Sequence, residues 1–317
     1  MQGSQSMIGD EYLQYPARKE GLDHNWFSFR SVKTTPRLKW PGAAQLALWI
    51  TMPLEFFPMS GSNAPFRPIG ALDRPYPDFW GYAARDYGLR IGVHRVIKAL
   101  DQRGLRATAA INMEAARRTP ALVDALAERG WEIMCAGADM GTLHHGGLDR
   151  TAEREIIASA LRHLRQGNWE VIGWHSPGHS QSMHTMELLA GEGIKYVADW
   201  VNDDLPYEVR TVNGDILAMP LTYELSDRKI MVEHDRTMDD YATMVLKAAR
   251  RLREETIGGA RILSLSVSPW IVGYPHRIAA FERILDGLIE QGPFWVAIGR
   301  EILEAYQSQM PQPIVRA

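Results

Sequence analysis

The chain has 317 residues and a mass of 35.8 kDa, of which 45% are hydrophobic and 23% are charged. This composition is typical of a globular protein with a sizeable core, in one large domain or two ordinary ones, and it excludes disordered and fibrous classes. Lys and Arg number 35 against 38 Asp and Glu, so the net charge of -3 provides no basic stripe for a phosphate backbone and we expect no nucleic-acid partner.

The cysteine content and the N-terminus bear on the cellular compartment. A single cysteine, Cys135, excludes an internal disulfide and a Cys-based zinc site, and it fits a reducing compartment. The opening residues lack the layout of a secretory signal, and no apolar run approaches the ~20 residues of a membrane span. We therefore expect a cytoplasmic protein with no membrane partner.

The chain divides into three parts by pattern. Residues 1–44 are rich in Pro, Arg and Lys without periodicity, and we interpret them as an extended N-terminal arm. Residues 45–305 alternate short apolar runs with segments of helical period, which predicts βα units around a mainly parallel sheet, and residues 306–317 are a C-terminal tail. The predicted strands are 46–52, 107–112, 132–137, 171–176, 196–201, 216–221, 262–267 and 294–298. The predicted helices are 92–103, 120–129, 152–166, 183–191, 239–255 and 275–291.

Local signals mark some of these boundaries. Thr119 and Pro120 are typical of a helix cap followed by a first-turn proline, while Gly104 and Gly130 stand where helices usually stop. Residues 53–86 are too long and too rich in Pro, Gly and aromatics for an ordinary connection, so we expect a lid or a subunit contact there.

The number of βα repeats favours a (β/α) barrel over an open doubly wound sheet. No GxGxxG opens a helix after a strand and no GxxxxGK[ST] occurs, so the phosphate-binding loops of dinucleotide and nucleotide enzymes are missing. In a barrel the reacting groups follow the strands at their C-terminal ends. Carboxylates and imidazoles gather at these places, which suits acid and base catalysis or a metal. The candidates are Glu55, Asn112, Asp139, His144, His145, Trp174, His175, Ser176, His179, Asp203 and Trp270.

Several candidates have an ordinary structural explanation as well. Glu55 could be an exposed loop carboxylate, and His175 could be a histidine satisfied within the core. Asp203 could serve as a turn former only, and His144 with His145 could form a turn before a helix capped by Asp149. Cys135 lies inside an apolar strand, which indicates a buried small hydrophobe rather than a nucleophile.

Four segments carry a resemblance to a known family. They are GWEIMCAGADMGTLHHGGLDR, VIGWHSPGHS, YVADWVNDDLPYEVRT and SVSPWIVGYPHRIAAFERIL. Together they resemble the polysaccharide deacetylase superfamily with the NodB-homology fold, and most closely its branch of cofactor-independent allantoinases and cyclic imide hydrolases. The resemblance implies a deformed (β/α) barrel of about seven strands, in a single domain. It also implies hydrolysis of an amide C–N bond, in an N-acetyl group or a ring amide.

The resemblance also implies a metal site that this sequence does not keep. Metal-using members hold a divalent ion with an Asp after the first strand and two His, four apart, after the third. Here the nearest carboxylate is Glu55, and the two His positions are Ala136 and Met140. Alanine and methionine cannot replace imidazole for a hard divalent ion, so we expect no metal and no other cofactor. The C-terminal Leu-His-Pro of many relatives reads Val267-Ser268-Pro269, which removes the usual general acid.

These departures leave a variant hydrolase as the favoured function. Glu55 or His144 would be the base that activates water, and His179 would protonate the departing nitrogen. Backbone N–H groups near Gly137 or Gly178 would polarise the carbonyl. We expect a small-molecule substrate, a cyclic imide, ureide or N-acylated compound, bound by the remaining candidates, with Trp174 and Trp270 as pocket walls.

Two other functions stay open. One is a diverged member that binds a ligand without hydrolysing it, and the other is a metal-dependent polysaccharide N-deacetylase of carbohydrate metabolism. The aromatic, Pro-rich N-terminal segments and the resembling branch both indicate a homo-oligomer.

Overall fold

The computed structural model describes residue 24 and residues 26–27, 37–60, 77–167, 169–255 and 259–310. Its strands are β1 (Leu46–Leu54), β2 (Thr108–Ile111), β3 (Glu132–Cys135), β4 (Gly173–Trp174), β5 (Tyr196–Val197), β6 (Tyr207–Val209), β7 (Ile216–Ala218), β8 (Arg261–Ser266) and β9 (Trp295–Ala297). Its α-helices are α2 (Phe79–Tyr87), α3 (Val93–Asp101), α4 (Met113–Arg118), α5 (Pro120–Glu128), α6 (Arg150–Gln166), α7 (Thr185–Gly191), α8 (Met238–Glu254), α9 (Pro269–Val272), α10 (Ile278–Glu290) and α11 (Gly299–Gln307). Short 3-10 or π turns are η1 (Pro41–Ala43), η2 (Gly88–Gly92), η3 (Pro177–His179), η4 (Tyr223–Leu225) and η5 (Arg228–Glu233).

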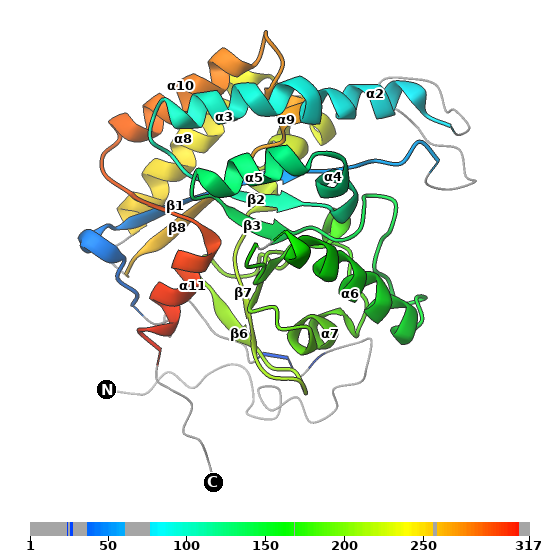
Figure 1. Ribbon diagram of the computed structural model, residues 1–317. Coiled ribbons are helices and arrows are strands. Elements are labelled where there is room, and N and C mark those ends of the chain that lie inside the picture. Colours follow the sequence, from blue (N-terminus) through cyan, green and yellow to red (C-terminus); the bar gives the residue numbers. More distant parts are fainter. Residues whose placement is uncertain are drawn as a thin grey trace, which may run out of the picture.

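One curled sheet organises the molecule (Figure 1). Its strands run in the order β6-β7-β5-β4-β3-β2-β1-β8, and β9 also pairs with β1. Every pairing is parallel except that between β6 and β7, which is antiparallel. The curl forms half of a barrel, which confirms the predicted deformed (β/α) barrel.

Strand β1 lies at the centre of the core because its sequence is apolar almost throughout. All nine of its residues, LALWITMPL, are buried, as is typical of a parallel strand covered on both faces. Helices α3, α8 and α10 pack together on one side of the sheet (Figure 1), with a mainly apolar face toward it. The C-terminal ends of the parallel strands therefore converge on one rim, where the polar loops lie.

All eight predicted strands and all six predicted helices occur, with shorter bounds for most of them. The sequence reading missed β6, α2, α4, α9 and α11, because each is short or lacks a clear period. Pro120 does open α5, and Gly104 and Gly130 have the left-handed φ of +62° and +71° that suits a glycine after a helix. Thr119 does precede α5, but the predicted side-chain cap is wrong. Its hydroxyl makes no capping hydrogen bond to α5 and donates instead to the Ala115 carbonyl oxygen at 2.8 Å.

Residues 24, 26 and 27 of the predicted N-terminal arm pack against the domain near the end of β5. The carbonyl oxygen of Trp26 accepts a hydrogen bond from the Arg210 N–H at 2.7 Å, and the Trp26 ring lies 5.3 Å from that of Trp200. The rest of the predicted arm, the centre of the 53–86 insertion and residues 311–317 of the tail lie outside the described residues. The helix α11 extends to Gln307, two residues into the predicted tail.

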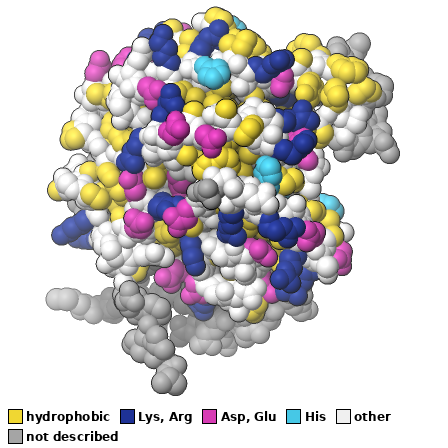
Figure 2. All heavy atoms as spheres, viewed as in Figure 1, with side chains coloured by type: hydrophobic (Ala, Val, Ile, Leu, Met, Phe, Trp, Pro, Cys, Tyr) yellow, Lys and Arg dark blue, Asp and Glu magenta, His cyan; other side chains and the backbone are white. Residues whose placement is uncertain are grey.

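Two further features of the described residues concern surface charge and helix length. On the face that Figure 2 shows, Lys and Arg side chains lie among Asp and Glu side chains rather than in one basic patch. No helix among the described residues combines the length and apolar character that a membrane crossing requires.

Candidate active site

A narrow cavity opens at the C-terminal ends of β1, β4, β7 and β8. It holds about 340 Å³ of space between atoms, including its open mouth. Its lining residues are Pro53, Glu55, His175, His179, Leu221, Tyr223, Ser226, Arg228, Ser266 and Ser268. Three of the predicted site residues therefore share one cavity, Glu55 from the end of β1 and His175 and His179 from the end of β4.

A carboxylate and a guanidinium form an ion pair in this cavity. Oε2 of Glu55 accepts a hydrogen bond from Nη2 of Arg228 at 3.0 Å and a second from Nε1 of Trp270 at 3.3 Å. The guanidinium carbon of Arg228 lies 5.6 Å from the ring centroid of Phe57 and 5.7 Å from that of Trp270. The aromatic rings thus hold the cation in place while its polar edge meets the carboxylate.

A histidine and a buried carboxylate form a second pair at the cavity. Nδ1 of His175 lies 3.1 Å from Oδ1 of Asp199 and 3.3 Å from the Ala198 carbonyl oxygen. Both neighbours are acceptors, so the proton belongs on Nδ1, and Nε2 is left as the basic atom of the ring. Asp199 also accepts hydrogen bonds from the N–H and the hydroxyl of Ser176, each at 2.7 Å, and from Nε2 of Gln181 at 2.6 Å.

These contacts set the charge on Asp199. Burial by itself raises the pKa of the carboxyl, but the hydrogen bond and charge of His175, with the help of Ser176, leave it below its usual range. Asp199 therefore stays ionised at neutral pH although its side chain is fully buried. An ionised carboxylate behind an imidazole orients the ring and stabilises its protonated form.

His179 lies beside this pair in a strained turn. Its φ is +55°, a left-handed value that is uncommon outside glycine. Its ring centroid lies 4.6 Å from that of His175 and 5.0 Å from that of Tyr223. Burial and the nearby His175 lower the pKa of His179 to about 4. A neutral imidazole is therefore expected there at neutral pH.

A second buried carboxylate lies at the other side of the cavity. Asp227 is fully buried and accepts hydrogen bonds from the N–H of Ser268 at 2.6 Å and from its hydroxyl at 3.0 Å. Burial raises the pKa of Asp227 to about 7 despite those bonds and the adjacent positive charge of Arg228. Ser268 lines the cavity, so it connects this carboxyl to the place where a substrate would lie.

The positions at which the resembled family holds its metal do not fit one here. Ala136 and Met140 offer no ligand, and Glu55 is occupied by Arg228 and Trp270. We therefore derive no chemical step through a metal at these positions.

Another group of side chains could hold a cation. His175, His179 and Asp199 each offer one ligand atom, and these atoms lie within 4.8 Å of one another. Two imidazoles and a carboxylate are a donor set of catalytic zinc sites. Asp199 already accepts three hydrogen bonds from neighbouring groups, and its Oδ1 also lies 3.1 Å from Nδ1 of His175.

His144 is absent from the cavity lining. Its ring is buried, with Nδ1 3.0 Å from Oε1 of Glu153 and its face near Trp174. Glu153 also accepts hydrogen bonds from the hydroxyls of Ser182 and Thr185, each at 2.5 Å. All these partners are internal, so the group joins the N-terminal turn of α6 to the segment before α7.

The other predicted residues mostly stabilise loops. Among them, Trp270 donates a hydrogen bond to Glu55, which lines the cavity, and Ser176 donates one to Asp199, the partner of His175. Asn112 is buried, accepting from the Phe56 N–H at 2.9 Å and donating to the Ala136 carbonyl oxygen. The remaining four do not reach the cavity: the carboxylates of Asp139 and Asp203 accept from turn N–H groups, His145 is exposed, and Trp174 is fully buried.

Four residues of this region were not among the candidates. Asp199 follows β5 but lies inside the longer predicted strand 196–201, so only a shorter strand within the quoted segment YVADWVNDD would have placed it at a strand end. Tyr223 lies in η4, Arg228 lies in η5, and Asp227 lies in the link between them. This segment has neither a strand pattern nor a helical period, so no sequence pattern indicated a site there. Only the folded chain brings them to the rim.

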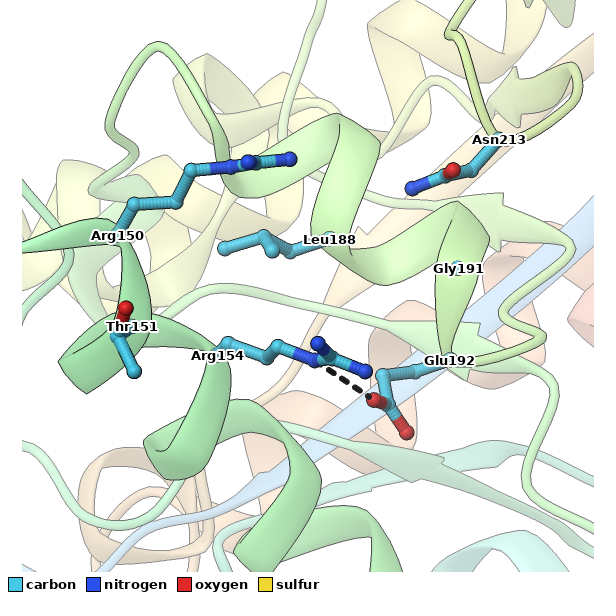
Figure 3. A pocket seen from close by; sticks show the side chains of 7 residues that line it. All are labelled: Arg150, Thr151, Arg154, Leu188, Gly191, Glu192 and Asn213. Carbon is cyan, nitrogen blue, oxygen red and sulfur yellow. Dashed lines mark ion pairs between the residues drawn. The ribbon is translucent and has the colours of Figure 1, made fainter.

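A second hollow lies on the surface between α6 and α7 (Figure 3) and holds about 820 Å³, including its mouth. Its two arginines are both matched by acids: Arg150 pairs with Glu187, and Nε of Arg154 lies 3.9 Å from Oε1 of Glu192. No predicted site residue lines this hollow. The balanced charges give it less catalytic potential than the smaller cavity at the strand ends.

Comparison with known proteins agrees with this geometry. No protein-family model matches the sequence. A Schizosaccharomyces pombe (strain 972 / ATCC 24843) protein named "Putative polysaccharide deacetylase" is 23% identical over 246 residues, 71% of this chain and 76% of that protein. A probable polysaccharide deacetylase from Pseudomonas aeruginosa PAO1 has a similar structure, with a TM-score of 0.79 and 24% identity over 88% of this chain and 96% of that one. The chain has the polysaccharide deacetylase fold.

An allantoinase shares this fold as well. The structure of Puue allantoinase gives a TM-score of 0.79 at 24% identity, covering 88% of this chain and 95% of that one. The resemblance drawn from the sequence motifs, to polysaccharide deacetylases with an allantoinase branch, is thereby confirmed at the level of the fold.

Proposed function

We propose that the chain is a hydrolase of amide C–N bonds other than peptide bonds, and that its substrate is a small cyclic amide such as an imide or a ureide. The fold shared with named polysaccharide deacetylases and an allantoinase supports the reaction class. The observation that carries the choice of substrate is the ion pair of Glu55 and Arg228 in the cavity.

This pair suits a cis amide. In a small ring the amide bond is forced into the cis form, so its carbonyl oxygen and its N–H lie on the same edge, whereas an open secondary amide such as an N-acetyl group is trans and presents them on opposite edges. Glu55 accepts and Arg228 donates, side by side at 3.0 Å. One ring edge can therefore give its N–H to Glu55 and receive a bond from Arg228.

Arg228 would also help the reaction itself. A carbonyl oxygen gains negative charge as water attacks, and a guanidinium that already contacts this oxygen stabilises the charge. In this arrangement Glu55 binds the substrate rather than activating water, since its Oε2 already accepts from Arg228 and Trp270. Tyr223, which lines the cavity, supplies a flat surface that suits a flat, uncharged ring.

His175 is the base that we assign to water activation. Asp199 and the Ala198 carbonyl oxygen hold the proton on Nδ1, which leaves Nε2 to accept a proton from water. The ionised Asp199 then stabilises the imidazolium that forms. His179, packed against His175, restricts the ring to one orientation and narrows the space for the water.

The proposal is tested with the purified full chain on two substrate classes. The first contains succinimide, hydantoin and dihydrouracil, and the second contains N-acetylglucosamine and its short oligomers. We expect turnover in the cyclic class only. Hydrolysis of the acetylated sugars without hydrolysis of any ring would contradict the cis-amide assignment.

A matched pair of variants tests the role of the guanidinium. Arg228→Gln removes the charged donor, and we expect kcat/KM on the cyclic substrate to fall about 10- to 100-fold, the worth of a hydrogen bond to a charged group. Arg90→Gln is the control, because Arg90 is exposed and pairs with Asp86 at 3.5 Å on the surface. Equal activity of the two variants would overturn the assignment of Arg228.

A further inference from the structure

The pair formed by Asp227 and Ser268 is not used by the reaction proposed so far. Asp227 comes from the link between η4 and η5, and Ser268 follows β8, so the chain brings them together from 41 residues apart. Ser268 donates through both its N–H and its hydroxyl, at 2.6 Å and 3.0 Å. A carboxyl that is fully buried and still connected to a cavity through a hydroxyl has a path for a proton.

The surroundings of Asp227 keep it poorly compensated as an anion. Arg228 is adjacent in the chain, but its Nη2 donates to Glu55. Burial raises the pKa of the Tyr241 phenol, from α8, and the nearby charge of Asp227 raises it further. Burial of a carboxylate costs free energy unless it is paired, and the raised pKa of Asp227, about 7, is the expected result.

Amide hydrolysis needs a proton donor at the leaving nitrogen. An amine or amide anion is a poor leaving group, so the nitrogen must be protonated as the C–N bond breaks. Ser268 offers a hydroxyl at the wall of the cavity. His179, the donor predicted from the sequence, packs against the rings of His175 and Tyr223.

We propose that Asp227 and Ser268 form a proton relay that protonates the departing nitrogen of the substrate. This inference rests on the proposed hydrolysis and supplies its missing acid. When Asp227 is protonated, its O–H donates to the Ser268 oxygen, which reverses the hydrogen bond that Ser268 gives to the ionised form.

The relay balances in protons and electrons. As the C–N bond breaks, its electron pair stays on nitrogen and takes the hydroxyl proton of Ser268. The Ser268 oxygen takes the proton of Asp227 at the same time and remains a hydroxyl. Asp227 is left as a carboxylate, and the proton that His175 removed from water restores it through solvent.

The first test does not depend on any substrate. Infrared difference spectra of the full-length protein between pH 5 and pH 9 report the carbonyl band of a protonated carboxyl, and the band of Asp227 is assigned by its loss in Asp227→Asn. The assignment is needed because Glu132 and Asp204 also have raised pKa values. We expect a band that is lost as the pH rises through about 7. A spectrum without such a band would overturn the relay.

The second test separates proton donation from binding. Ser268→Ala should lower kcat on succinimide about 10²- to 10⁴-fold, the usual worth of a general acid, while hydrolysis of 4-nitrophenyl acetate should stay near the wild-type rate because nitrophenolate leaves without a proton. Ser264→Ala is the control, since the Ser264 hydroxyl bonds to Thr222 instead. An equal loss on both substrates would mean that Ser268 only positions the loop, and would overturn the relay.

The two tests distinguish the failure of each idea. A wild-type protein that hydrolyses no cyclic amide contradicts the proposed function, whereas the infrared band alone decides whether Asp227 carries the proton. If Asp227→Asn fails to fold, the Ser268→Ala comparison still decides the relay.

Discussion

Two histidine–carboxylate pairs in this protein have nearly the same chemistry and different surroundings. Nδ1 of His175 lies 3.1 Å from Asp199, and Nδ1 of His144 lies 3.0 Å from Glu153. Each carboxylate also accepts a serine hydroxyl, and the pKa of each lies below its usual range because hydrogen bonds from the histidine and hydroxyl groups outweigh the effect of burial.

The difference is access to the cavity. The His175 side chain is 13% exposed and lines the cavity, whereas the His144 side chain is 0% exposed and faces only protein. One short segment serves both pairs, since Gln181 donates to Asp199 and Ser182 donates to Glu153. The same kind of pair thus serves chemistry at one place and holds the loop together at the other.

The largest effect is expected when the pair of His175 and Asp199 is broken. His175→Gln removes the base, and we expect kcat/KM on a cyclic imide to fall about 10²- to 10⁴-fold. The variant should melt close to the wild type, because Ser176 and Gln181 still satisfy the buried Asp199. Steady-state kinetics and thermal melts check both parts. Activity within a few-fold of the wild type would exclude His175 as the base.

Breaking the fully buried pair of His144 and Glu153 should lower stability and leave activity unchanged. His144→Ala leaves the buried Glu153 short of one donor, which should lower the free energy of unfolding by about 1–3 kcal/mol. Its kcat/KM per folded molecule should equal that of the wild type. Urea unfolding and kinetics below the transition measure the two quantities. A folded His144→Ala protein without activity would return His144 to the catalytic set predicted from the sequence.

The smallest effect concerns a third buried carboxyl, far from the rim. Burial raises the pKa of Glu132, despite hydrogen bonds from the Thr108 hydroxyl and the Arg300 N–H. The folded state therefore holds its proton to a higher pH than the unfolded chain does, so stability is lost as pH rises above the unfolded pKa of about 4.3. Glu132→Gln cannot ionise, so its melting temperature should exceed that of the wild type by a margin that grows from pH 5 to pH 9. A constant difference across this range would contradict the raised pKa.

Much of the fold could be predicted from the sequence because burial leaves a clear mark in it. The run of β1 is apolar throughout, and the period of α6 and α8 repeats over 17 residues each. The two-residue strands β4 and β5 could be placed only within longer apolar runs. Strand β6, with three residues, is too short for a recognisable strand pattern. The assembly, compartment and domain boundaries remain predictions.

The site was less predictable, for a physical reason. His144 and His175 both follow a strand, and nothing in the sequence near either one reveals which lines a cavity and which is fully buried. Asp227 and Arg228 reach the rim through an irregular link whose path depends on tertiary packing. Glu55 was placed correctly at the rim, but its contact with Arg228 spans 173 residues and could not be foreseen.

The central claim is that His175 and Asp199 activate water directly, although the same side chains with His179 could hold a cation. The most direct test measures kcat/KM on cyclic imides after exhaustive chelation, with the metal content of the same sample measured, and again after addition of zinc, manganese or cobalt. We expect full activity in metal-free protein and no gain from any metal. Activity that disappears on chelation and returns with one metal would contradict the account and assign the three side chains to that ion.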